Sequence, residues 1–439
     1  MKILSISAQK PHSTGSGTYM TELVKSFDAM GHRQIVVCGI YTHDKVSLPQ
    51  GVLCYPVHFT DSDFDFDFGS GSTSSNSFFR FERGLIHPDA DFVTEAEPPA
   101  RISYPIVGMS DSMPYPSTQY RKMTQEMLSE FDRAFITTIR RAVTDLNPDL
   151  IICHHLFLLT ALVRRHFPDR KVYGISHSTD LRQMTACDNL RNLVRPYIAG
   201  LDMALALHEE QKRQIVETFG IGEDKIKVIG AGYDHRRYNT EGREPRRKDD
   251  PVRLCFAGKL SKVKGIPELL SAVKNLHSDA YLPEFTLCMA GGCRDDEVLS
   301  LIQNLPAYVD WVGFVSNEEL TTMLKQCDIF ILPSYYEGLP LVIMESMASG
   351  ALPICTDLPG VREWIDSHVP NSEVRYIAMP EMEGIDTPSD SGRLHFVSDL
   401  ESVIRKAILD IYSGNLQGAA PDTSLARWDA VAAAILEGK

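Results

Sequence analysis

Strand-like and helical segments alternate through most of the chain, and this alternation limits the possible folds more than any other feature of the sequence. A strand-like run at 2–7 is followed by a loop at 9–17 and by a helical pattern at 19–30, which ends before Gly31. The second half repeats the alternation, with strand-like runs at 252–257, 285–290, 328–332 and 351–356. Such a pattern is typical of α/β folds with parallel sheets.

The length of the chain predicts two such domains, because 439 residues exceed what one hydrophobic core usually organises. The segment 241–251 is charged and lacks apolar residues, which indicates a linker. We therefore expect a Rossmann-like, doubly wound domain at 1–235, a linker at 236–250, a second Rossmann-like domain at 251–412 and a C-terminal segment at 413–439. Ligands of such sheets bind at the carboxyl ends of the strands, so functional residues are expected in strand-to-helix loops.

Composition and charge exclude several classes of protein. The formal net charge of -14 argues against wrapping a nucleic-acid backbone, which needs a positive face. Nine cysteines without a Cys-x-x-Cys pair favour a reducing compartment over a disulfide framework. The N-terminal run is too short and too interrupted for a signal peptide, and no apolar run approaches the roughly 20 residues of a membrane span. These features predict a cytoplasmic enzyme.

Residues 61–118 break the alternating pattern and are predicted to be an irregular insertion. The segment is too long for an ordinary connection, so it is either a functional loop or lid, or partly disordered. Its repeated Asp-x-Asp pattern resembles a calcium-binding loop but lacks the glycine at the sixth position and the distal glutamate. We therefore expect no calcium site in this segment.

The segment 333–350 carries the strongest functional signal. A strand-like run ends in a short polar loop, and Pro340 can serve as the first residue of the following helix. The N-terminus of that helix offers unpaired N–H groups to an anion such as a diphosphate. Glu337 precedes this site, and Glu345 lies about 7–8 Å further along the helix. Two carboxylates that bracket an anion site suit a nucleotide sugar. The structural alternative is that Glu337 caps the helix and Glu345 is a solvated surface residue.

Two further loops contain candidate phosphate-binding residues. Lys259 and Lys264 follow the strand-like run at 252–257, and lysine binds phosphate as a point charge. Gly15 and Gly17 follow the first strand, where glycine allows close approach of the backbone to a phosphate or a sugar. Met20 stands where the dinucleotide fingerprint has its third glycine, which argues against an NAD site.

Histidines follow two strand-like runs of the first half. His154 and His155 end one run, and His177 begins the segment His-Ser-Thr-Asp that contains Asp180. A single histidine is more often structural than catalytic. Several histidines at strand ends of one domain favour a functional site.

The run from Glu337 to Glu345 resembles the Glu-x7-Glu motif of retaining glycosyltransferase family 4, whose fold is GT-B, with two Rossmann-like domains facing across a cleft. The resemblance spans nearly the whole chain and is looser at 50–120. It includes the loop with Lys259 and Lys264, here called the lysine loop, the glycine-containing loop after the first strand, and the two segments that contain the histidines. It also includes the run at 228–232 before the linker and the helix at Arg427-Trp428-Asp429, which looks like a last helix that crosses back to the first domain.

The resemblance implies roles for individual residues. Lys259 and Lys264 would hold the donor diphosphate, Glu337 the sugar hydroxyls and Glu345 the ribose. Backbone N–H groups of Gly338, Leu339 and Leu341 would complete the donor site, Gly17 would contact the phosphate or the acceptor, and His177 the transferred sugar. His177, Lys264 and Glu337 are thus the candidate catalytic residues. His154, His155 and Asp180 would lie on the acceptor side. The family usually has arginine where Lys259 stands, so bidentate contact with the diphosphate is lost here.

The reaction implied by the resemblance is a retaining hexosyl transfer from a nucleotide sugar, commonly a uridine diphosphate sugar, to a hydroxyl acceptor, without a metal or other cofactor. The acceptor, a small molecule, a glycan or a lipid-linked sugar, stays open, as do the base, the sugar and the oligomeric state. The basic residues at 164–166 and 170–171 could meet an anionic lipid or simply be a solvated helix end. Alternatives are a phosphorylase or an epimerase on the same fold, and a non-catalytic glycosyltransferase-like subunit.

Overall fold

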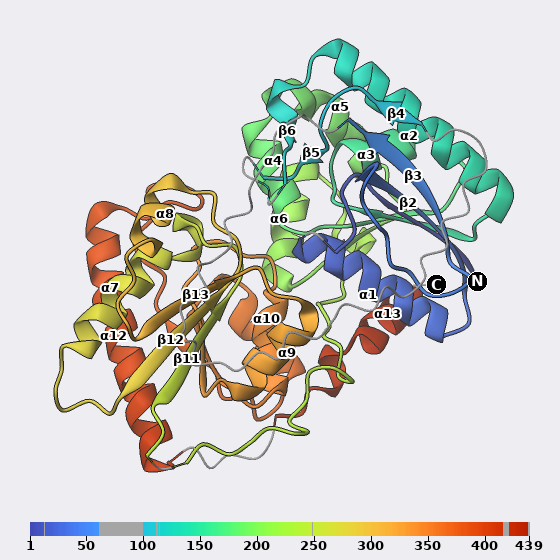
Figure 1. Cartoon of the computed structure of the whole chain (residues 1–439). Coiled ribbons are helices and arrows are strands. Elements are labelled where there is room, and N and C mark those ends of the chain that lie inside the picture. Colours follow the sequence, from blue (N-terminus) through green and yellow to red (C-terminus); the bar gives the residue numbers. More distant parts are fainter. Residues whose placement is uncertain are drawn as a thin grey trace. The chain divides into compact units, whose positions relative to one another are not determined.

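The computed structural model describes residues 1–12, 14–60, 100–110, 113, 115–247, 249–415 and 421–437. The described chain divides into two compact units, each with its own parallel sheet (Figure 1). Unit 1 contains residues 1–60, 100–232 and 428–437, and unit 2 contains 233–427. The predicted class of two α/β domains with parallel sheets is confirmed.

The sheet of unit 1 has eight strands in the order β10-β9-β8-β7-β1-β2-β3-β4. The strands are β1 (Lys2–Ser7), β2 (Arg33–Tyr41), β3 (Leu53–Phe59), β4 (Arg101–Ile102), β7 (Leu150–His154), β8 (Val172–Ile175), β9 (Met203–Ala206) and β10 (Ile226–Val228). Nearly every residue of β1 and β7 is buried, because helices cover both faces of a parallel sheet. The strand order reverses between β1 and β7, and a ligand crevice is expected at the carboxyl ends of such a strand pair.

The helices of unit 1 are α1 (Gly15–Ala29), α2 (Gln125–Leu146), α3 (Leu158–His166), α4 (Thr179–Ala186), α5 (Asp188–Ala199), α6 (Glu209–Phe219) and α13 (Trp428–Leu436), with single 3-10 turns at Tyr120–Lys122 and Glu223–Lys225. Helix α1 begins earlier than the sequence pattern predicts. The Thr14 hydroxyl accepts a hydrogen bond from the Gly17 N–H at 3.3 Å and caps the helix. Gly15 and Gly17 therefore lie in its first turn and not in a loop.

The described part of the predicted insertion at 61–118 packs against the core of unit 1. It includes the short parallel strands β5 (Val107–Gly108) and β6, which is Thr118–Gln119. Apolar side chains on either side of them are buried in the same core as β1 and β7, namely Ile102, Tyr104, Ile106, Met109, Met113 and Tyr115. The Asp-x-Asp repeat falls at 61–99, outside the described residues.

The sheet of unit 2 has six strands in the order β13-β12-β11-β14-β15-β16. They are β11 (Val252–Ala257), β12 (Phe285–Ala290), β13 (Val309–Gly313), β14 (Ile329–Leu332), β15 (Leu352–Thr356) and β16 (Arg375–Ile377). The order reverses between β11 and β14, whose residues pair as Leu254 with Ile329. The loops after β11 and β14 therefore start side by side, and they carry the predicted lysines and Glu337.

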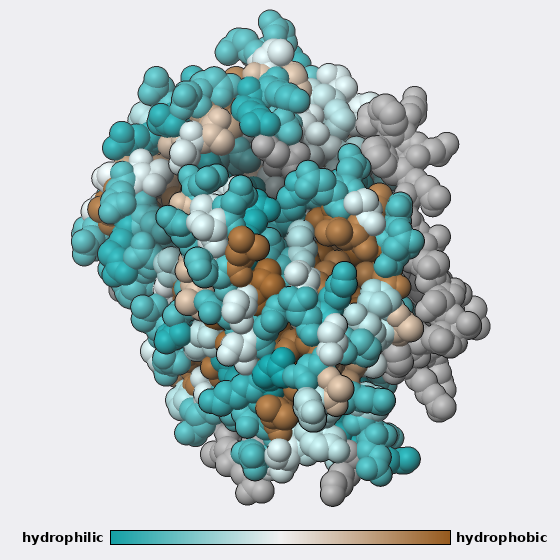
Figure 2. Space-filling view, turned by 90° about the vertical axis from the view of Figure 1, so that its left-hand side faces the viewer, coloured by the Kyte–Doolittle hydropathy of each residue, from teal (hydrophilic) through white to brown (hydrophobic). Residues whose placement is uncertain are grey.

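The helices of unit 2 are α7 (Ile266–His277), α8 (Asp296–Ile302), α9 (Asn317–Gln326), α10 (Leu341–Ala348), α11 (Val361–His368) and α12 (Asp390–Ser413), with 3-10 turns at Lys262–Lys264 and Ser424–Ala426. The long helix α12 packs on α7 at one side of the sheet (Figure 1). Figure 2 shows one face of the molecule, which is mainly hydrophilic with scattered apolar patches. No helix of the described ranges is long and apolar enough to cross a membrane.

The last helix, α13, belongs to unit 1 although it follows unit 2 in the chain. It packs beside α1 (Figure 1), and the Trp428 ring meets the Tyr19 ring edge-on with centroids 4.7 Å apart. Lys227 donates a hydrogen bond from Nζ to the Ala434 carbonyl oxygen at 2.6 Å. A Cβ atom at Gly232 would lie only 2.7 Å from the Trp428 backbone nitrogen, so a glycine is required where α13 begins.

Candidate functional site

The loop after β11 is pressed against the loop after β14. Gly265 has φ +66, and a Cβ atom there would lie 2.2 Å from the Pro333 carbonyl oxygen. The Tyr335 N–H donates a hydrogen bond to the Val263 carbonyl oxygen at 2.8 Å. Glycine both adopts this left-handed conformation and permits the close approach. The approach brings Lys264, near the end of the loop after β11, beside the loop after β14, which contains Glu337.

Lys264 and Glu337 form an ion pair at this junction. The Lys264 Nζ group donates a hydrogen bond to Glu337 Oε1. The two side chains are 24% and 14% exposed, so the pair is largely desolvated but still reachable from solvent. A partly desolvated ammonium group attracts an anion more strongly than one on an open surface. Two residues that the sequence singled out in separate segments therefore lie in direct contact.

Helix α10 begins next to this pair. Pro340 occupies the cap position, and no described side chain caps the helix. Leu341 and Glu345 are spaced by one turn and both are half-buried, whereas Ile343, Met344, Ser346 and Met347 are buried. The start of α10 and the Glu345 side chain therefore share its more accessible face. Among the backbone groups predicted to complete the site, Gly338 and Leu341 belong to half-buried residues and Leu339 is buried.

Lys259 lies near the start of the lysine loop and is half-buried. The residue after it, Leu260, pairs with Cys293 in a parallel bridge, which places Lys259 beside the loop that follows β12. Burial raises the pKa of the Cys293 thiol, and the Lys259 charge partly opposes this rise. Lys262 has a different partner, because its Nζ atom lies 2.5 Å from Glu297 Oε2.

The three predicted histidines of unit 1 form one cluster at the carboxyl ends of β7 and β8. His154 Nδ1 and His177 Nε2 are 3.1 Å apart, and the two rings are nearly parallel with centroids 5.3 Å apart. The His155 ring centroid lies 4.9 Å from that of His177. The Tyr19 ring meets His177 edge-on at 5.1 Å, and the Tyr19 hydroxyl donates to the Gly230 carbonyl oxygen at 2.7 Å.

The histidine cluster is electrically neutral near pH 7. Burial lowers the pKa of His154 and of His155 to about 3. Burial also lowers the pKa of His177 well below its ordinary value, and the neighbouring histidines add to this effect. Neutral imidazole rings offer one hydrogen-bond donor and one acceptor each, so this cluster suits hydroxyl groups better than phosphate.

Asp180 is fully buried and joins the two histidine loops. Its carboxylate accepts hydrogen bonds from the Leu156 N–H at 2.7 Å, the Ser176 hydroxyl at 3.0 Å and the His177 N–H at 3.1 Å. The three donors come from the loops that follow β7 and β8. These contacts make Asp180 a clamp that orients the histidine loops. The place of Asp180 on the acceptor side stays a prediction.

Gly17 has a clear packing constraint. A Cβ atom at this position would lie 2.8 Å from the Lys10 carbonyl oxygen and 3.0 Å from the His12 backbone nitrogen. The first turn of α1 therefore packs tightly against the loop that precedes it. The contact of Gly17 with a phosphate or an acceptor stays a prediction.

Two sequence models of protein families match adjacent parts of the chain. The model of "Glycosyltransferase Family 4" matches residues 112–237, and that of "Glycosyl transferases group 1" matches residues 239–378. Together they span more than half of the chain, and the second contains the lysine loop and both glutamates. The chain belongs to glycosyltransferase family 4.

Individual relatives of this family 4 member are distant. Glycogen synthase of Mycobacterium tuberculosis is 27% identical over 233 residues, which are 49% of this chain and 54% of that protein. A Campylobacter jejuni N-acetylgalactosaminyltransferase that acts on a diphospho-undecaprenol-linked sugar is 27% identical over 211 residues, 46% of this chain and 56% of that protein. Across the curated relatives compared, the matches span only 39% to 56% of the relative's length.

Solved structures match the family 4 chain over its whole length. Sucrose-phosphate synthase from Thermosynechococcus elongatus has a TM-score of 0.62 at 14% identity and covers 100% of this chain and 98% of that one. Anabaena Alr3699/HepE in complex with UDP and glucose has a TM-score of 0.55 at 14% identity, with 100% and 98% covered. These similarities show the fold, which is GT-B, as predicted.

The structure adds residues that the sequence reasoning missed. The hydroxyl groups of Ser334 and Thr356 are buried and have no hydrogen-bond partner among the described residues. Ser334 follows β14 and Thr356 is the last residue of β15, at the sheet edge that carries Glu337. Their positions at the ends of strand-like runs were the sequence signal that could have identified them. Tyr19 was missed because it lies on the apolar face of a helix. Within the described residues, no group of three or more histidine, cysteine, aspartate or glutamate side chains could hold a metal ion.

Proposed function

We propose that this family 4 member is a retaining glycosyltransferase that moves a hexose from a nucleoside diphosphate sugar, such as a uridine diphosphate sugar, to a hydroxyl acceptor. The contact between Lys264 and Glu337 beside the start of α10 carries the proposal. It combines a cation, a carboxylate and a helix N-terminus in one place. A diphosphate needs the first and third of these, and a sugar hydroxyl needs the second.

The electrostatics of the donor site support this assignment. Glu337 neutralises the Lys264 ammonium group. A diphosphate that approaches the start of α10 offers Lys264 a second anionic partner, and Glu337 can then accept hydrogen bonds from the sugar. Glu345 lies one turn beyond Leu341 on the same helix face, where it can accept hydrogen bonds from ribose hydroxyls.

The chemical step requires few protein groups. The bond between the anomeric carbon and the diphosphate oxygen breaks, and a new bond forms to the acceptor oxygen on the same face. The proton of the acceptor hydroxyl passes to the departing diphosphate. Lys259, Lys264 and the helix N-terminus stabilise the negative charge of that leaving group. We assign to His177 contact with the transferred sugar. Its neutral ring can form hydrogen bonds with sugar hydroxyls and does not attract phosphate as a charged ring would.

The relatives support a nucleotide sugar but do not identify the acceptor. Structures of Anabaena Alr3699/HepE are described in complex with UDP and with UDP-glucose, and another relative is named for a lipid-linked acceptor. We propose uridine diphosphate as the leaving group on this basis.

Calorimetric titration with UDP, GDP and ADP tests the proposal. We expect one of them to bind the wild type, and Lys264→Met to weaken that binding by about tenfold or more, because a charge-assisted hydrogen bond contributes about 1.5–3 kcal/mol. Lys262→Met is the matched control, since Lys262 lies in the same 3-10 turn but pairs with Glu297. Absence of binding by all three diphosphates, or equal losses in both variants, would overturn the donor site.

Turnover distinguishes transfer from its alternatives. With the sugar nucleotide identified by binding, product formation is followed by proton NMR of the anomeric centre. Retention of configuration on an alcohol acceptor supports the proposal. Product formation only with inorganic phosphate would instead indicate a phosphorylase, and conversion of the nucleotide sugar alone would indicate an epimerase.

A further inference from the structure

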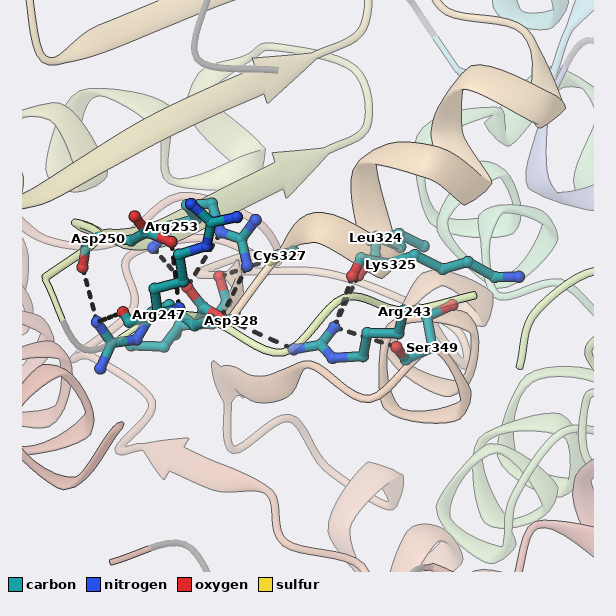
Figure 3. Close-up of polar contacts among 11 residues, drawn as sticks. Arg243, Arg247, Asp250, Arg253, Leu324, Lys325, Cys327, Asp328 and Ser349 are labelled. Atoms are coloured by element: carbon teal, nitrogen blue, oxygen red, sulfur yellow. Dashed lines mark hydrogen bonds and ion pairs between the residues drawn. The ribbon is translucent and has the colours of Figure 1, made fainter. Parts of the chain in front are cut away.

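Arg243 contacts the ends of two helices of unit 2. It lies in the linker segment, shortly after the chain enters unit 2 at Tyr233. Its Nη1 group donates to the carbonyl oxygens of Leu324 at 3.4 Å, Lys325 at 3.0 Å and Ser349 at 3.2 Å (Figure 3). Leu324 and Lys325 belong to the last turn of α9, and Ser349 is the C-terminal cap of α10.

These contacts have a clear physical basis. The last carbonyl groups of a helix lack partners within the helix and carry partial negative charge. The Arg243 side chain is 19% exposed, so its contacts with these carbonyls are shielded from water. A Cβ atom at Gly350 would lie 3.1 Å from Arg243 Cδ, and Gly350 has φ +88. A glycine after α10 therefore leaves room for the arginine stem.

The linker is also attached to α9 by a second residue. Lys325 Nζ donates hydrogen bonds to Asn239 Oδ1 at 3.1 Å and to the Glu241 carbonyl oxygen at 2.8 Å. The linker from Asn239 to Arg243 is thus bound to unit 2 at several points. It forms part of the support under α9 and α10.

Helix α10 spans eight residues, so its two ends are only about 12 Å apart. One end carries Ser349, which Arg243 holds, and the other end is the proposed diphosphate site. No described side chain caps that other end. A short rigid helix that tilts at its C-terminal end also displaces its N-terminal N–H groups, and a small displacement of binding groups weakens a site strongly.

We propose that Arg243 is a positioning residue for the donor site, which acts by holding the C-terminal end of α10 so that its N-terminus and Glu345 stay aligned with Lys264. The inference rests on the proposed function of this site. It means that Arg243, a linker residue at the C-terminal end of α10, affects ligand binding at the N-terminal end of the same helix.

Arg253 supplies a matched control in the same cluster. Its Nε and Nη2 atoms are each 3.3 Å from Asp328 carboxylate oxygens, and its backbone N–H donates to the same carboxylate at 2.9 Å. Arg243 Nη2 is 3.8 Å from Asp328, so both arginines face one buried carboxylate. The polar contacts of Arg253 in Figure 3 do not include α10. A purely structural role predicts similar effects of replacing either arginine.

The test compares Arg243→Met, Arg243→Lys and Arg253→Met by titration with UDP and by thermal unfolding. We expect Arg243→Met to raise the dissociation constant of UDP by about tenfold. Arg253→Met should lower the melting temperature but change the UDP dissociation constant less than about twofold. Arg243→Lys should recover part of the affinity, because lysine keeps the charge but loses the planar fork. Equal UDP affinities in the two methionine variants would overturn the inference.

Hydrogen exchange of the ligand-free protein provides a readout that does not depend on nucleotide binding. In Arg243→Lys, which keeps a cation and is the variant expected to fold, the amides of α10 should exchange faster while those of α7 stay unchanged. Unchanged exchange in α10 would refute the positioning role. If the wild type binds no nucleotide but α10 exchanges faster in the variant, the proposed function fails while the support of α10 by Arg243 stands.

Discussion

Lys264 and Glu337 are 73 residues apart in the chain, yet the ammonium group of one donates a hydrogen bond to the carboxylate of the other. Two features produce this contact. Strands β11 and β14 are neighbours at the point where the strand order reverses, and Gly265 lets the loop after β11 approach Pro333. The ion pair is therefore a product of the fold of unit 2, and it places the cation proposed to bind phosphate beside the carboxylate proposed to bind the sugar.

Replacement of Glu337 by glutamine should separate sugar binding from diphosphate binding. Glu337→Gln removes the anion that neutralises Lys264, so UDP affinity should stay the same or rise. Turnover of the sugar nucleotide should fall by about 100-fold, because the strong acceptor for the sugar hydroxyls is lost. Steady-state kinetics and UDP titration together measure this split. Glu297→Gln, which removes the partner of Lys262, should leave both unchanged. A parallel loss of UDP binding would contradict the assignment of Glu337 to the sugar.

Replacement of Gly265 by alanine should break the contact between the two loops. Its Cβ atom would lie 2.2 Å from the Pro333 carbonyl oxygen, so the lysine loop must move away from Glu337. Gly414→Ala is the control, because Gly414 has a similar φ of +70 and a Cβ atom there would meet nothing within 4 Å. Both variants carry a conformational cost of about 1–2 kcal/mol. Only Gly265→Ala should also weaken UDP binding, by about tenfold or more. Equal UDP affinity in the two variants would contradict this prediction.

Replacement of Asp180 by asparagine should loosen the histidine cluster. The buried carboxylate accepts three hydrogen bonds, and an amide group turns a donor toward one of those N–H or O–H groups. We expect Asp180→Asn to lower the free energy of unfolding by about 2–3 kcal/mol. Asp149→Asn is the control, because this exposed residue accepts one backbone N–H, from Lys2. Urea denaturation measures both. A cost below about 0.5 kcal/mol for Asp180→Asn would show that the carboxylate does not act as the clamp.

The histidine cluster should make unit 1 less stable in mild acid. Because burial lowers the pKa of His154 and His155 from 6.5 to about 3, the unfolded chain binds protons at a higher pH than the folded chain. Stability is therefore complete above about pH 6.5 and falls as the pH drops toward 3. At pH 5 the loss should be about 2 kcal/mol for each of these two residues.

Urea denaturation at several pH values, followed by Trp428 fluorescence with Trp311 and Trp364 replaced by phenylalanine, measures this dependence in unit 1. In His154→Gln the slope of stability against pH should decrease by about one proton equivalent. The control His43→Gln replaces a histidine outside the cluster, whose side chain is 62% exposed. A pH-independent stability between about pH 7 and pH 5 would show that the cluster titrates normally.

The sequence alone determined the elements of the fold and the loops that carry the candidate site. Apolar runs bounded by polar loops predict strands wherever a parallel sheet is buried on both faces, and β11, β12, β14 and β15 lie where this pattern placed them. The spacing of Glu337 and Glu345 around Pro340 is likewise local. Nearby residues predicted a helix that starts at Pro340, one residue before the observed start of α10 at Leu341, and Pro340 is its cap. The Glu-x7-Glu motif is also a local pattern, so the sequence could predict membership of glycosyltransferase family 4, which is confirmed.

Tertiary structure decided which of these residues meet. The pairing of β11 with β14 brings Lys264 to Glu337, and the buried carboxylate of Asp180 joins the loops that follow β7 and β8. The contact of Arg243 with the end of α10 also depends on a backbone carbonyl group whose position no side-chain pattern encodes. Local periodicity specifies helices and strands, whereas contacts between distant loops depend on strand order and on close approaches such as that at Gly265.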